Sequence, residues 1–330
     1  MACRRQVKLR LTFVGSASLC LDLFLTLRRK PKSVSPRRLD SRGGNKIEFT
    51  EKKPGRSLRS PAEKQHMKFV YPEGKRKALT FSYDDGLCAD RQLVSVFNQY
   101  GLKGTFHLVS GFFDTPGAVG SEEVKTLYAG HEVACHGVNH IDPLANTLPQ
   151  MVVELLDNKR ALETVTGKRV SGLSYAYGRY SEEVKQLARA LGIQYSRTVT
   201  ETNEFNLPED LLEWHPTCHH NSPRLKELGE RFLTLQDFFE LPLMYVWGHS
   251  FEFDEAKNWN IIEECAELMS GKEDVWYATN GEIADYITAV RNLQFSADCT
   301  HVFNPGTFAV WCLTESGLLE LKPGAYQQVK

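Results

Sequence analysis

The sequence has no pair of cysteines in Cys-x-x-Cys spacing, and its eight cysteines are scattered along 330 residues. A chain of this length can build a core without disulfide bonds, so we expect free, mostly buried thiols and a reducing compartment. No internal repeat or low-complexity array is evident. The composition, 42% hydrophobic and 25% charged residues, is that of an ordinary globular protein. We therefore expect one large domain with an appendage.

An excess of positive charge is missing from most of the chain. Of the 40 Lys and Arg residues, 17 fall within residues 1–66, together with 5 of the 41 Asp and Glu residues. Residues 67–330 therefore carry 23 basic and 36 acidic side chains, a net charge of -13. Because an acidic body is poorly suited to phosphate backbones, we expect no nucleic-acid partner.

A hydrophobic run long enough to span a membrane is also missing. Residues 11–27 are mostly apolar and follow a basic start, as in a signal peptide or a weak anchor. However, Asp22 interrupts this run, which falls short of the ~20 residues that a spanning helix needs. Basic residues then follow at 28–30, where small residues would permit cleavage. We therefore do not expect this segment to hold the protein in a membrane.

Residues 1–66 as a whole are interpreted as a basic, disordered leader or the product of a misassigned start. Because the charge changes and the regular pattern begins at Met67, we hypothesise that the native protein begins there. No export signal would then remain, which predicts a cytoplasmic location. The alternative is secretion or membrane anchoring through residues 1–30.

After Met67, short apolar strands alternate with helices that begin at a cap residue and end at glycine. The expected strands are 78–83, 104–110, 132–135, 170–177, 193–199, 241–248 and 275–278. The expected helices are 90–100 (capped by Asp90), 121–130 (capped by Ser121), 147–167 and 279–290 (each opened by a capping box), 181–192 and 254–271. About seven alternations predict a parallel α/β fold and, at this length, a distorted (β/α)7-8 barrel.

Two segments depart from this alternation. Residues 200–230 are polar and without period, so we expect a long irregular excursion that serves a site or moves. Beyond residue 290 the pattern changes to short strands around proline–glycine turns, which predicts a small C-terminal β appendage. We therefore divide the chain into residues 1–66, a barrel at 67–290 and the appendage at 291–330.

The strand expected at 78–83 ends in two adjacent carboxylates, Asp84 and Asp85, followed by Gly86. Burying unpaired carboxylates is costly, so such a pair needs water, protons or a cation. Neighbouring carboxylates can also take separate roles, one on a metal and one as a base. For this segment alone, an ordinary Asp-Gly turn is the alternative.

Polar residues follow other expected strands as well. His136 and His140 follow the third, Tyr177 ends the fourth and His249 follows the sixth. Each placement alone has an ordinary explanation, but in a parallel barrel the carboxyl ends of the strands meet at one face. Two imidazoles and one of the aspartates suit a divalent cation, leaving the other aspartate as a base. Zinc is our first choice, and manganese, iron, cobalt and nickel suit the same ligands.

These segments resemble the signatures of carbohydrate esterase family 4, the polysaccharide deacetylase superfamily, whose fold is a distorted barrel of seven or eight strands. Its signatures Thr-Phe-Asp-Asp-Gly and His-Ser/Thr-x-x-His are similar to Phe81-Ser-Tyr-Asp-Asp-Gly86 and His136-Gly-Val-Asn-His140. Its Arg-x-Pro-Tyr-Gly is matched at Tyr177-Gly178, and its Leu-x-His by Trp247-Gly-His249. The family's aspartate–tryptophan signature, which falls between these two, is not placed in this sequence. The resemblance covers about residues 76–285.

Three positions depart from the family pattern. Gly137 replaces the hydroxyl residue of the second signature, Ser174 stands where the third has arginine, and Ala176 where it has proline. Since the family arginine orients the base, another arginine is expected to take its place. Arg179 and Arg197 are the candidates, on position alone.

The resemblance implies a metal-dependent hydrolase that removes N-acetyl groups from an amino sugar or glycan. It implies one role for each of six residues: Asp84 as base, Asp85, His136 and His140 as metal ligands, the backbone N–H of Tyr177 as oxyanion donor, and His249 as general acid. The expected partner is an acetylated sugar or a small amide, and the oligomeric state stays open. The alternatives are an amidase or O-acetyl esterase acting on another substrate, and a catalytically silent carbohydrate-binding protein, which the missing arginine favours.

Three further groups near these signatures have two interpretations each. One group of aromatic residues is either a stacking platform for a sugar or part of the core: Trp214, Trp247, Phe251 and Trp259. His219 and His220 either extend the site or, as we favour, form a solvated loop pair. Glu252 either tunes His249 or is an acid at a helix start.

Overall fold

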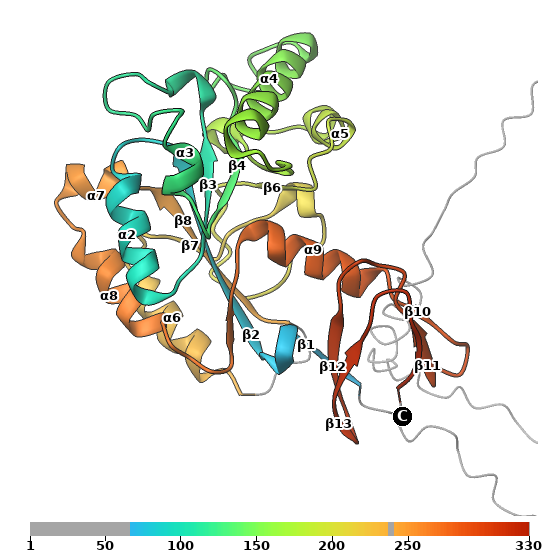
Figure 1. Ribbon diagram of the computed structural model, residues 1–330. Helices are drawn as coiled ribbons and strands as arrows, with labels where there is room; N and C mark the ends of the chain where they lie inside the picture. Colours follow the sequence, from blue (N-terminus) through green and yellow to red (C-terminus); the bar gives the residue numbers. More distant parts are fainter. Residues whose placement is uncertain (1–66, 237–240, 330) are drawn as a thin grey trace, which may run out of the picture. The chain divides into compact units, whose positions relative to one another are not determined.

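The computed structural model describes residues 67–236 and 241–329, so the predictions for residues 1–66 lie outside the described part. Eight strands form one curled parallel sheet (Figure 1). They are β2 (Lys77–Asp85), β3 (Gly104–Leu108), β4 (Glu132–Cys135), β5 (Gly172–Ser174), β6 (Tyr195–Arg197), β7 (Cys218–His219), β8 (Leu243–His249) and β9 (Val275–Tyr277). The order is β6-β5-β4-β3-β2-β8-β7, and β9 pairs with the start of β2. The predicted α/β class with a parallel, barrel-like sheet is confirmed.

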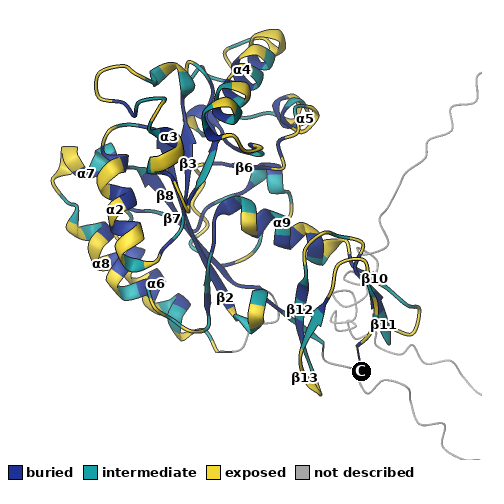
Figure 2. Cartoon of the chain, viewed as in Figure 1, coloured by how far each residue is buried: buried dark blue, intermediate teal, exposed yellow. Residues whose placement is uncertain are grey.

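Helices cover this sheet, whose strands are almost entirely buried while the helices expose one side (Figure 2). They are α2 (Asp90–Tyr100), α3 (Val124–Leu127), α4 (Leu148–Thr166), α5 (Glu182–Ala190), α6 (Leu225–Thr234), α7 (Phe251–Ala256), α8 (Asn260–Met269) and α9 (Asn280–Arg291). The described residues also form four single-turn 3-10 helices: η1 (Pro72–Gly74), η2 (Ser110–Phe112), η3 (Ala176–Gly178) and η4 (Leu211–Glu213). Within the described residues, no helix combines the length and apolar character that crossing a bilayer requires.

Local sequence explains where several helices begin and end. Thr279 and Glu282 form the predicted capping box of α9: the Thr279 N–H donates to Glu282 Oε2 (2.8 Å) and the Glu282 N–H to Thr279 Oγ1 (3.2 Å). The predicted box at the start of α4 is also present. Gly101 and Gly167 end α2 and α4 with φ of +65° and +67°, a conformation that suits glycine because it has no Cβ.

Successive side chains of β2 lie on opposite faces of the sheet, as in any strand. One set packs in the apolar core under the helices: Leu79, Phe81 and Tyr83. The other set faces the interior of the curled sheet, where Arg197 Nε donates to Ser82 Oγ (3.1 Å) and the same guanidinium contacts Asp84. This polar interior leads from the middle of β2 to the carboxylates at its end.

Residues 214–220 run between the two edges of the curled sheet. The Trp214 N–H donates to a carbonyl of β6 (2.9 Å), and the Thr217 N–H donates to a carbonyl of β8 (2.8 Å). The prediction of an irregular excursion holds for residues 200–210, which form no helix or strand, and was wrong for 211–230, which contain η4, β7 and the first part of α6. A two-residue strand is too short to produce a period in the sequence.

Three predicted helix boundaries were also wrong. Asp90 does not cap α2, because its carboxylate is fully buried and hydrogen-bonded inside the core. The helix predicted from Ser121 shrinks to the single turn α3. The helix predicted at 254–271 is two helices, α7 and α8, and Lys257 between them has φ +53°.

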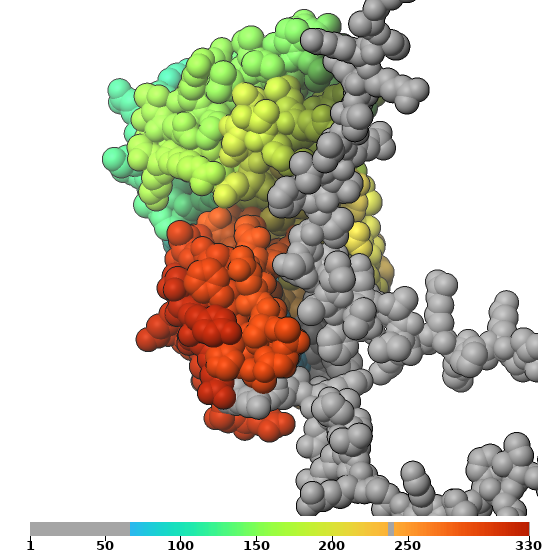
Figure 3. All heavy atoms as spheres, turned by 90° about the vertical axis from the view of Figure 1, so that its right-hand side faces the viewer, coloured from blue at the N-terminus to red at the C-terminus, as the bar shows by residue number. Residues whose placement is uncertain are grey.

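Two small antiparallel sheets lie beside the parallel sheet. One has the order β1-β12-β13, formed by Lys68–Val70, Val310–Thr314 and Gly317–Leu321. The other has the order β10-β11-β14, formed by Gln294–Phe295, His301–Phe303 and Tyr326–Gln328. The C-terminal residues gather in one mass, red in the space-filling view (Figure 3). The division at residue 290 stays a prediction, and the first sheet takes β1 from the start of the described chain.

Four of the cysteines are buried free thiols, as predicted: Cys135, Cys218, Cys265 and Cys312. Cys135 ends β4, Cys218 begins β7 and Cys265 lies on α8. Burial raises the pKa of each of these three thiols to about 12, so they remain protonated and serve as small apolar core residues.

Candidate functional site

Asp84 and Asp85 both face His136 at the carboxyl end of β2. The His136 Nε2 atom lies 3.6 Å from Asp84 Oδ2 and 3.6 Å from Asp85 Oδ1. Neighbouring residues of a strand usually point to opposite faces. Asp85 has φ +83° and Gly86 has φ +77°, so the strand ends abruptly at this pair. The break in regular geometry brings two adjacent carboxylates to one place.

Asp85, His136 and His140 form the predicted ligand group. One ligand atom from each lies within 4.8 Å of the others, and His140 Nε2 is 4.0 Å from Asp85 Oδ1. His140 has φ +55°, which is unusual for a non-glycine residue and typical of functional sites. The structure therefore brings together the three side chains that the sequence selected as metal ligands.

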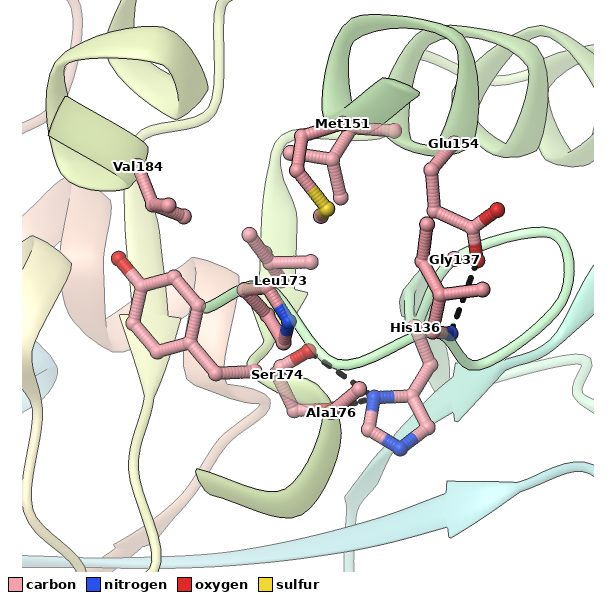
Figure 4. A pocket seen from close by; sticks show the side chains of 12 residues that line it. His136, Gly137, Met151, Glu154, Leu173, Ser174, Ala176 and Val184 are labelled. Carbon is pink, nitrogen blue, oxygen red and sulfur yellow. Dashed lines mark hydrogen bonds between the residues drawn. The ribbon is translucent and has the colours of Figure 1, made fainter. Parts of the chain in front are cut away.

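The hydrogen bonds of His136 leave its Nε2 atom available to a metal. Its Nδ1 lies 2.9 Å from the Ser174 carbonyl oxygen, and since a carbonyl can only accept, Nδ1 carries the proton (Figure 4). Nε2 then presents a lone pair towards Asp85. Asp85 Oδ1 is buried and has no hydrogen-bond partner within the described residues. An orphaned carboxylate oxygen beside two imidazoles fits a divalent cation.

Two side chains of α4 hold the loop that carries His136 and His140. Asn158 Oδ1 accepts hydrogen bonds from the N–H groups of His136 (3.1 Å) and Gly137 (3.2 Å). Glu154 accepts a hydrogen bond from the Asn139 N–H (2.7 Å). A Cβ at Gly137 would lie 2.5 Å from Glu154 Oε1, and Gly137 has φ +88°. The replacement of the family's hydroxyl residue by glycine therefore makes room for Glu154.

Arg197 is the arginine that contacts Asp84. It is fully buried on β6, and its Nη2 donates to Asp84 Oδ2. Arg179, the other candidate, is half exposed and pairs with Asp142 at 2.6 Å. Burial alone would raise the pKa of Asp84, but the charge of Arg197, with help from nearby histidines, holds it well below its usual value.

Ser174, at the position of the family arginine, makes room for an arginine that comes from β6 instead. It lies opposite Arg197 in the β5–β6 pairing and donates its hydroxyl hydrogen to Asp84 Oδ1 at 3.1 Å. The small side chain leaves the interior open for the guanidinium from the next strand. The same Oγ lies 2.6 Å from His136 Nδ1, so Ser174 links the base candidate to a ligand candidate.

His249 lies beside Asp84 at the end of β8. The two residues are opposite each other in the β2–β8 pairing. His249 Nδ1 is 2.9 Å from Glu252 Oε1, so the interpretation of Glu252 as a partner of His249 is supported. Burial alone would lower the pKa of His249, but Glu252, Asp84 and Asp85 raise it above its usual value.

His219 and His220 are not the solvated loop pair that the sequence favoured. His220 is fully buried, and both imidazoles approach Glu252, giving a second group of three possible ligands. No sequence pattern marks this group, because Glu252 comes from α7, more than thirty residues later in the chain. Only the pairing of β7 with β8 brings these residues together.

Of the two interpretations of the aromatic group, a single stacking surface does not form. Trp214 is buried in the core, and Trp247 lies against the Arg197 guanidinium, 4.4 Å from ring to carbon. Trp259 packs against Phe253 with 4.9 Å between ring centres. Phe251 and Trp247 both lie near the site, with their ring centres 5.3 Å and 5.8 Å from that of His249.

Tyr177 lies at the open side of the site. It is 62% exposed, has φ +58°, and its ring lies 4.5 Å from the His140 ring. Tyr177 and His140 line an open depression of about 550 Å³ together with Asn139, Ile141, Asp142, Asn146 and Arg179. A small cavity of about 10 Å³ lies behind His136, large enough for about one water molecule (Figure 4). The open depression is large enough to admit a substrate beside Tyr177, whereas the cavity behind His136 is not.

Comparison with known proteins agrees with this geometry. Residues 71–196 match the polysaccharide deacetylase family. A peptidoglycan deacetylase of Helicobacter pylori (strain ATCC 700392 / 26695) is 29% identical over 109 residues, which cover 33% of this chain and 36% of that protein. The chain therefore spans about a third of the length of this relative.

Two solved structures have the same fold. A putative polysaccharide deacetylase from Mycobacterium smegmatis has a TM-score of 0.52 at 17% identity, over 68% of this chain and 94% of that one. A probable polysaccharide deacetylase from Pseudomonas aeruginosa PAO1 has a TM-score of 0.50 at 17% identity, over 64% and 90%. At this identity the likeness concerns the fold. The similarity to the polysaccharide deacetylase family covers residues 71–196, less than half of the chain.

Proposed function

We propose that this protein is a metal-dependent hydrolase that removes N-acetyl groups from an amino sugar or glycan. One observation supports this assignment above the others: Asp84 and His249 lie side by side at the ends of paired strands, next to the Asp85–His136–His140 group. A base and an acid beside a candidate metal site are the parts that amide hydrolysis requires.

The metal would be held by Asp85, His136 and His140, and zinc is our first choice because two imidazoles and one carboxylate leave an open position. When bound, such a cation supplies Lewis-acid polarisation of the substrate carbonyl and lowers the pKa of water towards ~7. The orphaned Asp85 Oδ1 and the free Nε2 of His136 support these assignments.

Asp84 is proposed as the general base. Arg197 and the Ser174 hydroxyl hold its two oxygens, and Arg197 keeps the carboxylate ionised. An ionised carboxylate in a fixed position can take the proton of the attacking water as the C–O bond forms. Its position beside Asp85 but outside the three-ligand group supports the division of roles between the two aspartates.

His249 is proposed as the general acid. Cleavage of the C–N bond expels an amine, which without a proton is a very poor leaving group. His249 is the neighbour of Asp84 on β8 and has a raised pKa, so it can carry the proton that the amine nitrogen receives. The backbone N–H of Tyr177 is proposed to stabilise the tetrahedral oxyanion, supported by the unusual φ that turns the chain at this position.

The presence of Arg197 against Asp84 argues against a catalytically silent binding protein, since the absent family arginine was the reason to consider one. An O-acetyl esterase or an amidase on another substrate would use the same groups, and leaving-group chemistry distinguishes them. The open, polar depression beside Tyr177 suits a sugar more than an apolar amide.

The test is metal analysis of the purified protein combined with a panel of acetylated compounds. We expect one divalent metal per chain and release of equal amounts of acetate and free amine from N-acetylated amino sugars. Release of acetate from O-acetyl sugars alone would favour the esterase. A metal-loaded protein that releases no acetate from any N-acetyl, O-acetyl or amide compound would overturn the proposal.

A further inference from the structure

A second polar cluster lies behind His249, and the proposed reaction does not use it. Glu252 Oε2 lies 3.3 Å from His219 Nε2 and 3.0 Å from His220 Nε2. The other oxygen of the same carboxylate, Oε1, faces His249 Nδ1 at 2.9 Å. One carboxylate thus connects the general-acid candidate to two further histidines.

The hydrogen bonds of His219 speak against a second metal at this cluster. The Asn221 N–H donates to His219 Nδ1 at 3.1 Å, so Nδ1 carries a lone pair and Nε2 carries the proton. A protonated Nε2 faces Glu252 Oε2 at 3.3 Å and cannot ligate a cation. His136 shows the opposite arrangement, with a protonated Nδ1 and a free Nε2. A carboxylate and two imidazoles therefore meet in both places, but the nitrogen that faces the carboxylate carries a lone pair in His136 and a proton in His219.

The position of His220 is fixed by its surroundings. Its ring is fully buried and stacks between Tyr83 (5.6 Å, 15°) and Phe253 (4.1 Å, 26°). A Cβ at Gly248 would lie 2.0 Å from His220 Nδ1, so glycine at this position of β8 makes room for the ring. Burying an imidazole costs free energy unless its polar atoms meet a partner, and Glu252 is the charged group that it approaches.

Glu252 receives contacts from several directions. Besides the imidazoles, Asn221 Nδ2 donates to Glu252 Oε2 at 3.1 Å, and Asn258 Nδ2 in turn donates to Asn221 Oδ1 at 3.1 Å. Burial alone would raise the pKa of Glu252, but hydrogen bonds from His219, then His220 and His249, hold it well below its usual value. Glu252 is therefore held as an anion.

We propose that His219 and His220 are positioning residues for the general acid: they fix Glu252 so that its Oε1 receives the His249 Nδ1 proton. This rests on the proposed function. With Nδ1–H held by Glu252, the Nε2 of His249 is the nitrogen that gives its proton to the amine as the C–N bond breaks. Around His249 the charged groups are Glu252 on α7 and Asp84 and Asp85 on β2.

The experiment compares Glu252→Gln, His219→Phe and His219→Gln with the wild-type holoenzyme. Glu252→Gln keeps the shape of the side chain and loses its charge, and His219→Phe loses the donor that His219→Gln retains. We expect the first two to lower kcat by about tenfold or more, part of the ~10²–10⁴ that a positioned acid contributes, with KM nearly unchanged. His219→Gln should restore most of the loss. Glu255→Gln, an exposed change of charge on the same helix, should have no effect.

Imidazole ¹⁵N NMR of His249 provides a readout that does not depend on turnover. In the wild type we expect Nδ1 to stay protonated as pH rises through the titration, whereas in Glu252→Gln the proton divides between the two nitrogens and the titration moves to lower pH. An unchanged His249 spectrum in Glu252→Gln would overturn the positioning role even in a protein with no deacetylase activity. The same NMR measurement on His220→Phe removes the imidazole nitrogens and keeps a ring that can still stack.

Metal analysis tests the remaining alternative, that the cluster of His219, His220 and Glu252 binds a second metal ion. A hydrogen-bonded cluster predicts the same metal content in the wild type and in Glu252→Gln. A second equivalent of metal in the wild type that is lost in Glu252→Gln would overturn the proposal and identify the cluster as a metal site.

Discussion

Arg197 and Ser174 occupy paired positions on the neighbouring strands β6 and β5, and both side chains bond to Asp84. Strands in a sheet lie about 4.8 Å apart, so an arginine moved from one strand to the next can still reach the same carboxylate. An arginine therefore reaches Asp84 from β6, although Ser174 stands where the third signature of the similar family has arginine.

Replacing Arg197 by methionine should destabilise the protein by about 3–5 kcal/mol, because it leaves the carboxylate of Asp84 buried without its main counter-charge. Urea unfolding with a chelator present would measure this without a contribution from metal. Arg179→Met provides the matched control: its pair with Asp142 is half exposed, and its loss should cost about 0–1 kcal/mol. Equal costs for the two variants would contradict the role of Arg197.

Moving the arginine from β6 to the paired position on β5 tests by gain of function whether its contact with Asp84 is what matters. The single change Arg197→Ser should remove most of the proposed activity. The double variant Ser174→Arg/Arg197→Ser should recover part of it, because the guanidinium would again reach Asp84 from the opposite position on β5. Turnover measured at saturating metal would show the difference. A double variant no more active than Arg197→Ser would mean that the interior is shaped for an arginine on β6 alone.

The motif residues of the site could be predicted from the sequence because each sits at the end of a strand. Parallel strands place their carboxyl ends on one face, so His136, His140 and one of the two aspartates were expected to meet there. The choice of Asp85 as the ligand came from the resemblance to the family signatures. For the arginine that contacts Asp84, the sequence left two candidates, Arg179 and Arg197. Choosing between them required the β5–β6 register, which depends on pairing between strands and leaves no mark in a single sequence.

Other parts of the site could not be predicted because they depend on contacts between distant segments. The two-residue strand β7 has no periodicity, so His219 and His220 were assigned to a loop. Its pairing with β8 buries His220 against Glu252. Asp90 was assigned to a helix cap because aspartate before an apolar stretch usually has that role. Its actual partners, Tyr128 and Ser250, are remote in the chain.

Two variants should distinguish the roles of the adjacent carboxylates Asp84 and Asp85. Asp84→Asn should keep metal and lose turnover by about 10²–10⁴-fold, as expected when a general base is removed. Asp85→Asn should lose both metal and turnover, because the amide is a poorer ligand than the carboxylate in the three-residue group. Metal content and acetate release, measured on the same samples, decide the assignment. Loss of metal in Asp84→Asn with retention in Asp85→Asn would reverse the two roles.

Gly137→Ser restores the hydroxyl that the family pattern has at this position, and we expect it to impair the site. The new Cβ would lie 2.5 Å from Glu154 Oε1 in a backbone with φ +88°, so the loop from His136 to His140 has to shift. Metal affinity should fall by about 10–100-fold, as when groups that orient metal ligands are changed.

Gly101→Ser is the control for Gly137→Ser, because it introduces the same backbone strain without steric overlap. Gly101 has φ +65°, and no atom lies within 4 Å of the position that a Cβ would take, so the change should cost about 1 kcal/mol of stability and leave metal affinity unchanged. Isothermal titration with zinc on both variants provides the comparison. Equal affinities in Gly137→Ser and the wild type would show that Glu154 can move aside.

Asp90 should make the stability of the apoprotein depend on pH. Burial raises the pKa of this carboxyl to about 7, while Ser250 and Tyr128, which donate to it at 2.5 Å and 2.7 Å, oppose the shift. Between the unfolded pKa near 4 and about 7, the folded state holds a proton that the unfolded state has released. The contribution to stability is therefore complete below pH ~4 and is lost as pH rises through about 7.

Asp90→Asn should remove this dependence, because the amide resembles the protonated carboxyl and does not titrate. Relative to the wild type, the variant should gain up to about 1.4 kcal/mol of unfolding free energy per pH unit between pH ~4 and ~7, and no more above that range. Urea unfolding in the presence of a chelator, at intervals of half a pH unit, measures the difference. Glu267→Gln, an exposed change of charge on α8, should show the same dependence of unfolding free energy on pH as the wild type. A constant difference between Asp90→Asn and the wild type over the whole range would show that Asp90 is ionised in the folded protein, with its charge met by Ser250 and Tyr128 alone.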